Sequence, residues 1–235
     1  MKNRILTIIF ISLVLIVSLF QIIQAQQLQN AREINQDKKR TKADKIAIMD
    51  DRRDLDRLSD LILRWDRLRK TKNQAALDRI EARIFAALRN DLKEAQLEAN
   101  QAKRETKQSA KEVKRSKREA RRERYDKDRN KKALKDDVRD LRDDRRDLKD
   151  DVRDAQEANQ LLAQKKAIAK KLIVLQKQID TPGKKGDKAL QKKQHSLLEE
   201  YLKLSQKEIQ MGIRELKEDR RELREDRREK REDLK

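Results

Sequence analysis

Residues that interrupt helices are almost missing from this chain, and this restricts its fold more than any other feature. The 235 residues include one Pro and three Gly, and aromatic residues make up only 3%. Sheets need turns and favour β-branched and aromatic residues, so a β fold has little to build on. Charged residues make up 46%, which is typical of long helices and coiled coils. We predict an all-α protein of elongated helical hairpins, with weak coiled-coil pairing and long charged helices.

The N-terminus has the layout of an export signal. The basic start MKNR is followed by the apolar run ILTIIFISLVLIVSLF and then by the small residue Ala25. A secretory signal peptide has this order, so we predict one over residues 1–25, cleaved after Ala25. The alternative is a retained membrane anchor, because residues 5–23 are nearly long enough to span a bilayer. In both cases we expect the rest of the chain to be exported, to the periplasm or outside the cell.

The exported part must hold together without disulfides, because the chain has no Cys. Long helices satisfy their own backbone hydrogen bonds and can do this. The sequence also has no Asn-x-Ser/Thr glycosylation acceptor, which fits a bacterial envelope better than a eukaryotic secretory route.

Apolar spacing predicts two helical hairpins. Residues 26–42 are polar with little periodicity and are expected to be a flexible lead-in. Over 43–98, two apolar stripes with helical spacing flank a polar break, in which Asn73 can cap the second helix. Over 156–213, two further stripes flank a turn at 181–186, where DTPGKKG cannot continue a helix.

The segments outside the hairpins are dominated by charge. Residues 99–155 have few apolar side chains but good helix formers, so we predict one long charged helix that packs against little, with a kink or fraying at 125–130. Residues 214–235 are expected to form a charged helical tail.

The segment KDDVRDLRDDRRDLKDDVRDA, residues 135–155, repeats a charged heptad that recurs near the C-terminus. With Val138 at position a, acidic residues fall at g and basic residues at e, which favours a parallel partner. The turn at 181–186 would instead bring 214–235 back antiparallel beside 135–153, and both pairings stay open. The candidate coiled-coil seam consists of Val138, Leu141, Leu148, Val152, Leu216 and Leu223.

The acidic heptads could also suggest a metal site. An EF-hand needs alternate carboxylates in a loop with a central Gly and a terminal Glu, and this segment has neither Gly nor loop. Its aspartates alternate along the helix with arginines and lysines, which offset the charge that a cation would need. We expect a solvated charged helix here, and we keep divalent cation binding as a third hypothesis with no metal ligands assigned.

A basic run over residues 103–132 is the candidate polyanion contact. Only Trp65, Phe85, Tyr125 and Tyr201 are aromatic after residue 25, too dispersed for base stacking, and export argues against nucleic acid. Anionic lipid headgroups or polysaccharides of the envelope are the expected partners, and a soluble charged spacer without a polyanion partner is the alternative. The candidate residues are Lys103, Arg104, Lys107, Lys111, Lys114, Arg115, Lys117, Arg118, Arg121, Arg122 and Arg124.

The sequence carries no sign of catalysis. It lacks Cys, a Gly-rich phosphate loop and a His-based metal spacing, and its exposed carboxylates lack the burial that tunes an acid or base. The sole His195 is expected on the polar side of a helix. We therefore predict no catalytic residue, no cofactor and no small-molecule substrate.

The segment ADKIAIMD, residues 43–50, resembles the start of the mature chain in Skp-type periplasmic chaperones. The basic, exported, helical-hairpin character is similar to that family, whose members grip unfolded outer-membrane proteins between helical tentacles. The match covers eight residues and lacks the strand-forming continuation, so no site residue is carried across. We expect a structural or scaffold protein that self-associates through coiled coils, with a holdase-type chaperone as the alternative.

Overall fold

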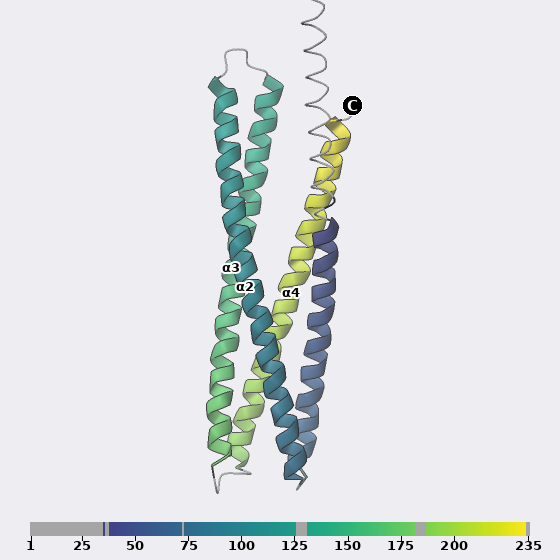
Figure 1. Ribbon diagram of the computed structural model, residues 1–235, viewed down its shortest axis with the longest axis vertical. Helices are drawn as coiled ribbons and strands as arrows, with labels where there is room; N and C mark the ends of the chain where they lie inside the picture. Colours follow the sequence, from purple (N-terminus) through teal and green to yellow (C-terminus); the bar gives the residue numbers. More distant parts are fainter. Residues whose placement is uncertain (1–34, 36–37, 72, 126–130, 182–186, 234–235) are drawn as a thin grey trace, which may run out of the picture. The chain divides into compact units, whose positions relative to one another are not determined.

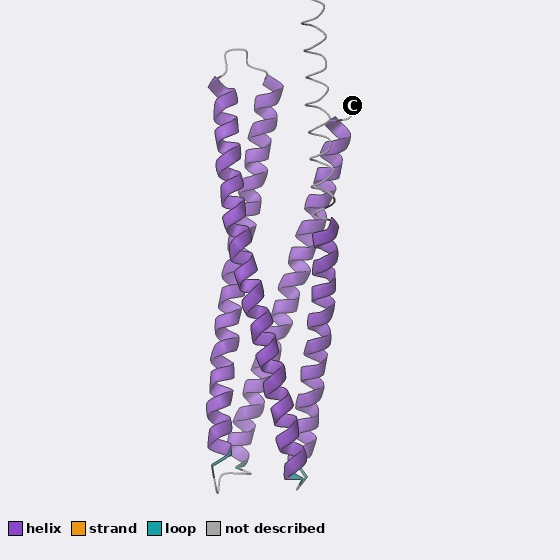
Figure 2. Cartoon of the chain, in the orientation of Figure 1, coloured by secondary structure: helices purple, strands orange, loops and turns teal. Residues whose placement is uncertain are grey.

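The computed structural model describes residues 35, 38–71, 73–125, 131–181 and 187–233. The described residues form four helices and no strand, which confirms the all-α prediction (Figures 1 and 2). The helices are the first helix over 38–69, α2 (Gln74–Tyr125), α3 (Lys131–Ile179) and α4 (Lys188–Asp233).

None of these helices combines the length and the apolar character that crossing a bilayer would need, over the part of the chain that was searched. The predicted signal peptide, residues 1–25, lies outside the described residues, as does most of the predicted lead-in. The predicted kink at 125–130 and turn at 181–186 fall largely on 126–130 and 182–186, which are also outside them.

Local side-chain caps start α2 and α4. The Asn73 side-chain oxygen accepts a hydrogen bond from the backbone N–H of Ala76 at 3.1 Å, which confirms the predicted cap. Asp187 does the same for α4, accepting from the N–H groups of Ala189 at 2.8 Å and Leu190 at 3.3 Å. Two polar residues in short breaks thus fix where the long helices begin.

The described chain divides into two compact units. The larger lies within residues 51–211, and the smaller combines the described residues up to 50 with those from 212 onwards. In the larger unit, all four helices contribute to one apolar core. The two predicted hairpins, 43–98 and 156–213, therefore do not form separate cores, because their apolar stripes pack against each other. Its buried residues are Leu58, Ile62, Trp65, Leu77, Ile80, Ile84, Leu88, Ile168, Leu172, Leu175, Ile179, Leu197, Leu198 and Tyr201.

The prediction of one long, largely unpacked helix over 99–155 is wrong. α2 and α3 run side by side in opposite directions beyond the apolar core (Figure 1). Ser109 of α2 bonds to Asp151 of α3, and Ser116 bonds to Asp144, so both halves of the predicted helix face each other. We call this part of the larger unit, residues 99–125 and 131–155, the polar arm.

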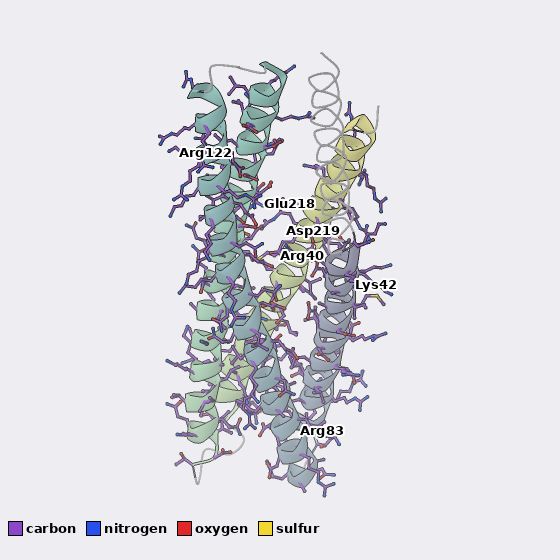
Figure 3. The ribbon with its side chains drawn as sticks, turned by 45° about the horizontal axis from the view of Figure 1, so that its top comes forward. Arg40, Lys42, Arg83, Arg122, Glu218 and Asp219 are labelled. Atoms are coloured by element: carbon purple, nitrogen blue, oxygen red, sulfur yellow. The ribbon has the colours of Figure 1, made fainter. Side chains whose placement is uncertain are left out.

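In the smaller unit, residues 38–50 lie beside the second half of α4. A Cβ atom at Gly212 would lie 3.2 Å from Cγ1 of Ile48, so a residue without a side chain lets this isoleucine pack closely. Figure 3 shows charged side chains, among them Arg40, Glu218 and Asp219, on these two helical segments.

Candidate functional site

A polar chain crosses the apolar core and joins all four helices of the larger unit. Trp65, fully buried, donates its indole N–H to Glu81 of α2 at 2.9 Å. Gln176 of α3 donates to the other oxygen of Glu81 at 3.0 Å and accepts from Gln194 of α4 at 2.7 Å. Burial raises the pKa of Glu81 although both hydrogen bonds oppose this. This row of hydrogen bonds fixes the relative register of the helices, because a slip of one helical turn would leave these buried groups unpaired.

A second polar cluster surrounds Lys165, eleven residues before Gln176 on α3. Its side chain is 0% exposed, and its ammonium donates to Asp91 of α2 at 2.9 Å and to Glu208 of α4. Tyr201 of α4 donates its hydroxyl to the same Asp91 oxygen at 2.5 Å. A buried ammonium is costly unless it is paired and hydrogen-bonded, and here two carboxylates supply both.

The Lys165 cluster holds more carboxylates than one ammonium can balance. Burial raises the pKa of Glu208 to about 7 against the effect of Lys165, and burial together with Glu94 raises that of Asp51 to about 6. Burial lowers the pKa of Lys165, but Glu208 and Asp91 outweigh it and the net shift is upward. Lys165 therefore stays charged at neutral pH, while part of the acidic charge is neutralised by protons.

A cavity of about 10 Å³ adjoins this cluster, bordered by acidic side chains and by Ser205. This volume admits one water molecule at most. Ser205 is buried, and its hydroxyl has no hydrogen-bond partner among the described residues. The part of the chain that the structure describes contains no group of three or more acidic or histidine side chains placed to hold a metal ion.

His195 is more enclosed than its polar neighbours indicated. Its Nε2 lies 2.7 Å from Asp66, its side chain is 30% exposed, and its ring stacks on Trp65 with centroids 6.3 Å apart. The ring thus covers the tryptophan at the edge of the core, a packing role that the sequence did not indicate.

The predicted polyanion residues lie together on the part of α2 that belongs to the polar arm. All eleven are exposed; Arg122 stands out from α2 in Figure 3. We call this surface the basic face: Lys103, Arg104, Lys107, Lys111, Lys114, Arg115, Lys117, Arg118, Arg121, Arg122 and Arg124.

Small side chains on the opposite side of α2 explain this exposure. Ala99, Ser109, Ser116 and Ala120 are buried, spaced so that they share one side of the helix. Ser109 and Ser116 donate to carboxylates of α3, and Thr106 donates to the backbone oxygen of Asp151 at 3.1 Å. Small residues let the helices approach closely, so the long basic side chains are left to face solvent.

The candidate seam residues differ in exposure, whereas a single coiled-coil stripe would bury all of them to a similar extent. Val138 is 44% exposed, whereas Leu141, Leu148 and Val152 are half-buried and Leu223 is buried. Leu216 is half-buried, and it lies with Leu223 in the smaller unit. Asp144 and Asp151, placed at flanking positions by the heptad pattern, are the residues that bond to α2. The hydroxyl groups of α2 therefore draw these aspartates into the contact between the two helices.

Some of the remaining aspartates of the polar arm pair with arginines. Arg146 contacts Asp143, and Arg153 contacts Asp150 at 3.1 Å, both three residues apart. Burial, followed by the charges of Asp144 and Asp151, raises the pKa of Asp147 to about 6. The crowding of carboxylates on α3 is thus partly relieved by arginines, and it makes Asp147 easier to protonate than an isolated aspartate.

An open apolar groove of about 340 Å³ lies between α2 and α3 beside the core. Its apolar lining includes Ile173, which is 48% exposed. The groove residues are Phe85, Leu88, Arg89, Leu92, Ala169, Ile173, Gln176 and Lys177. The sequence did not single out this groove, because its residues read as parts of two separate core stripes.

The Lys165 cluster was also missed, although the sequence carries a signal for it. Lys165 replaces an apolar residue at a helical spacing between Leu161 and Ile168. A charged residue inside an apolar stripe indicates a buried ion pair. The partners of Lys165 are Asp91 and Glu208, 74 and 43 residues away, so spacing along the sequence cannot identify them.

No family model, curated protein or solved structure is significantly similar to this chain.

Proposed function

We infer that this protein is an exported helical scaffold of the bacterial cell envelope that contacts anionic surfaces through the basic face of α2. The exposure of all eleven basic side chains on one helix carries this proposal. A polybasic segment gains about 1 kcal/mol per Lys or Arg at an anionic membrane, so several of these residues together are enough for stable contact.

The distribution of charge over the polar arm supports a one-sided contact. Residues 99–125 of α2 contain eleven basic and four acidic residues, a net charge of +7. Residues 131–155 of α3 contain nine of each. An anionic surface is therefore attracted to α2, while α3 serves as the partner that holds α2 straight.

Vesicle sedimentation tests this contact. Replacing Lys107, Lys111, Lys114 and Arg118 with Gln should weaken binding to vesicles containing phosphatidylglycerol by about a hundredfold or more, at about 1 kcal/mol per residue. The matched control replaces four exposed lysines of α4 with Gln: Lys188, Lys192, Lys193 and Lys203. Equal weakening by both variants would show that only net charge matters, and binding unaffected by added salt would contradict an electrostatic contact.

Self-association through coiled coils is a further part of the proposal. It is supported by the heptad spacing of residues 135–155 and by the exposure of Val138, although Asp144 and Asp151 of these heptads are already bonded to α2. Solution scattering with molar mass tests it: a dimer at micromolar concentration is expected, and a monomer at every concentration would contradict it.

The export proposal rests on the pattern of residues 1–25. N-terminal sequencing of the protein recovered from a periplasmic fraction is expected to start at Gln26. Recovery of the intact N-terminus with the membrane fraction would favour the retained anchor instead.

The holdase-type chaperone is the alternative. It would need an apolar cavity able to hold a stretch of unfolded client, whereas the groove of 340 Å³ has the size of a small-ligand site. Prevention of client aggregation by the purified chain would favour the chaperone over the scaffold.

A further inference from the structure

The groove between α2 and α3 combines an apolar floor with two cations. Leu88 and Ala169, both buried, belong to its lining, and Ile173 remains 48% exposed beside them. Arg89 and Lys177, from opposite helices, belong to the same lining and are exposed. Exposed Ile side chains are ordinary when single, but an apolar hollow of this size flanked by cations is suited to a ligand of matching chemistry.

The two cations are not committed to carboxylates. The Arg89 Nε–H donates to the backbone oxygen of Phe85 at 3.3 Å, one turn earlier. Within the described part of the chain, neither the Arg89 guanidinium nor the Lys177 ammonium forms an ion pair. Elsewhere arginines pair with aspartates three or four residues away, as Arg57 does with Asp54 and Arg64 does with Asp60. The charge at the groove is therefore available for an anion.

Polar contacts between the two helices flank the groove. At one end Lys166 donates to Gln96 at 2.5 Å, and at the other Gln176 donates to Glu81 at 3.0 Å. The apolar stretch of α2 between them, from Phe85 to Leu92, is about 10 Å long by helix rise. This length suits part of one medium-length acyl chain.

We propose that this groove binds a single medium-length acyl chain whose anionic headgroup is held by Arg89 and Lys177. The apolar floor removes the chain from water, and the two cations select a carboxylate or phosphate head over a neutral or cationic one. This site lies outside the basic face, so it is a second point of contact with anionic amphiphiles and does not depend on the proposed scaffold function.

Calorimetry with two amphiphiles of equal chain length tests the headgroup. Laurate and dodecyltrimethylammonium, each below its micelle concentration, are titrated into the purified full chain. We expect laurate to bind once per chain and at least tenfold more tightly than the cationic amphiphile. Equal affinities, or many laurate molecules bound per chain, would overturn the proposal.

Adjacent residues of α3 supply a matched pair of variants for the floor. Ile173→Asp should weaken laurate binding at least tenfold. Val174→Asp should leave it unchanged, because Val174 is 57% exposed and does not line the groove. Both positions are about half exposed, so both variants should fold, which circular dichroism checks. Equal effects of the two variants would contradict a groove.

A second pair of variants tests the cations without touching the apolar floor. Replacing Arg89 and Lys177 with Gln should remove the preference for laurate. Replacing Arg83 and Lys203, exposed residues of α2 and α4 outside the groove, should keep it. Variants of the basic face should also keep laurate binding, so failure of the scaffold proposal is separable from failure here. Sedimentation could instead show a dimer that dissociates in the Ile173→Asp variant and that laurate does not dissociate. This result would assign the groove to a second copy of the chain and overturn the proposal.

Discussion

The larger unit holds α2 against α3 in two different ways. In the first region, around Trp65 and Tyr201, large apolar side chains from all four helices exclude water, and two polar clusters set the register. In the second region, the polar arm, the buried side of α2 carries alanines and serines, and bonds from serine hydroxyls to aspartates of α3 join the helices.

This difference separates stability from surface chemistry. Burial of large side chains gives about 1.5–3 kcal/mol for each, so the apolar region can carry the fold. The polar arm buries little apolar surface, and its small inward residues leave one side of α2 free to carry basic residues. In the polar arm, α2 presents eleven basic side chains to solvent and is held to α3 by short polar contacts on its other side. This arrangement needs no large apolar side chains on α2.

The largest expected effect comes from breaking the apolar region at Trp65. Trp65→Ala removes a fully buried ring and its bond to Glu81, and should destabilise the protein by about 3–5 kcal/mol. Chemical denaturation followed by circular dichroism measures this loss. Trp65→Phe, which keeps an aromatic ring but removes the N–H donor, should cost less. Equal losses for both would show that the hydrogen bond, not packing, dominates.

A smaller effect is expected from breaking the polar arm at Ser116. Ser116→Ala removes the donor to Asp144 and should cost about 1–3 kcal/mol, because the carboxylate is left partly buried without its partner. Ser116→Ala combined with Asp144→Ala should cost less than the sum of the single changes. Hydrogen exchange along the arm measures the local effect. Strict additivity would show that the two side chains do not interact.

The smallest effect concerns pH and the Lys165 cluster. The pKa of Glu208 is raised to about 7 and that of Asp51 to about 6, so the folded state binds protons more tightly than the unfolded state. The stability that this proton binding supplies is complete below about pH 4 and is lost as pH rises towards about 7. Asp51→Asn should raise the Tm at pH 8 by about 2–4 °C, the shift of about 1 kcal/mol in a chain of this size, and flatten the pH dependence.

Asp150→Asn is the matched control for this measurement. Asp150 is in the polar arm and has its own arginine partner, so the change should not reproduce the effect of Asp51→Asn. A Tm that falls on acidification from pH 7 to pH 5 would contradict the assignment of raised pKa values to the cluster.

Local sequence determined much of this fold. The shortage of Pro and Gly made the described part of the chain all-α, and Asn73 started α2 through a contact three residues away. The basic residues of α2 are exposed, as their density indicated, because so many charges cannot be buried on one helix. These features depend on composition or on neighbours within one helical turn, which a sequence states directly.

Only the tertiary structure decided which polar residues would meet. Lys165 reaches Asp91 across 74 residues, and Ser109 reaches Asp151 across 42, in a chain where similar residues recur at nearly every turn. Repetitive charge makes many pairings nearly equal in energy. The heptad pattern of residues 135–155 favoured a parallel partner, but it could not decide which segment would pair with them. The folded chain pairs them with α2 instead, because that arrangement continues from a shared apolar core and satisfies the hydroxyl and carboxylate groups together.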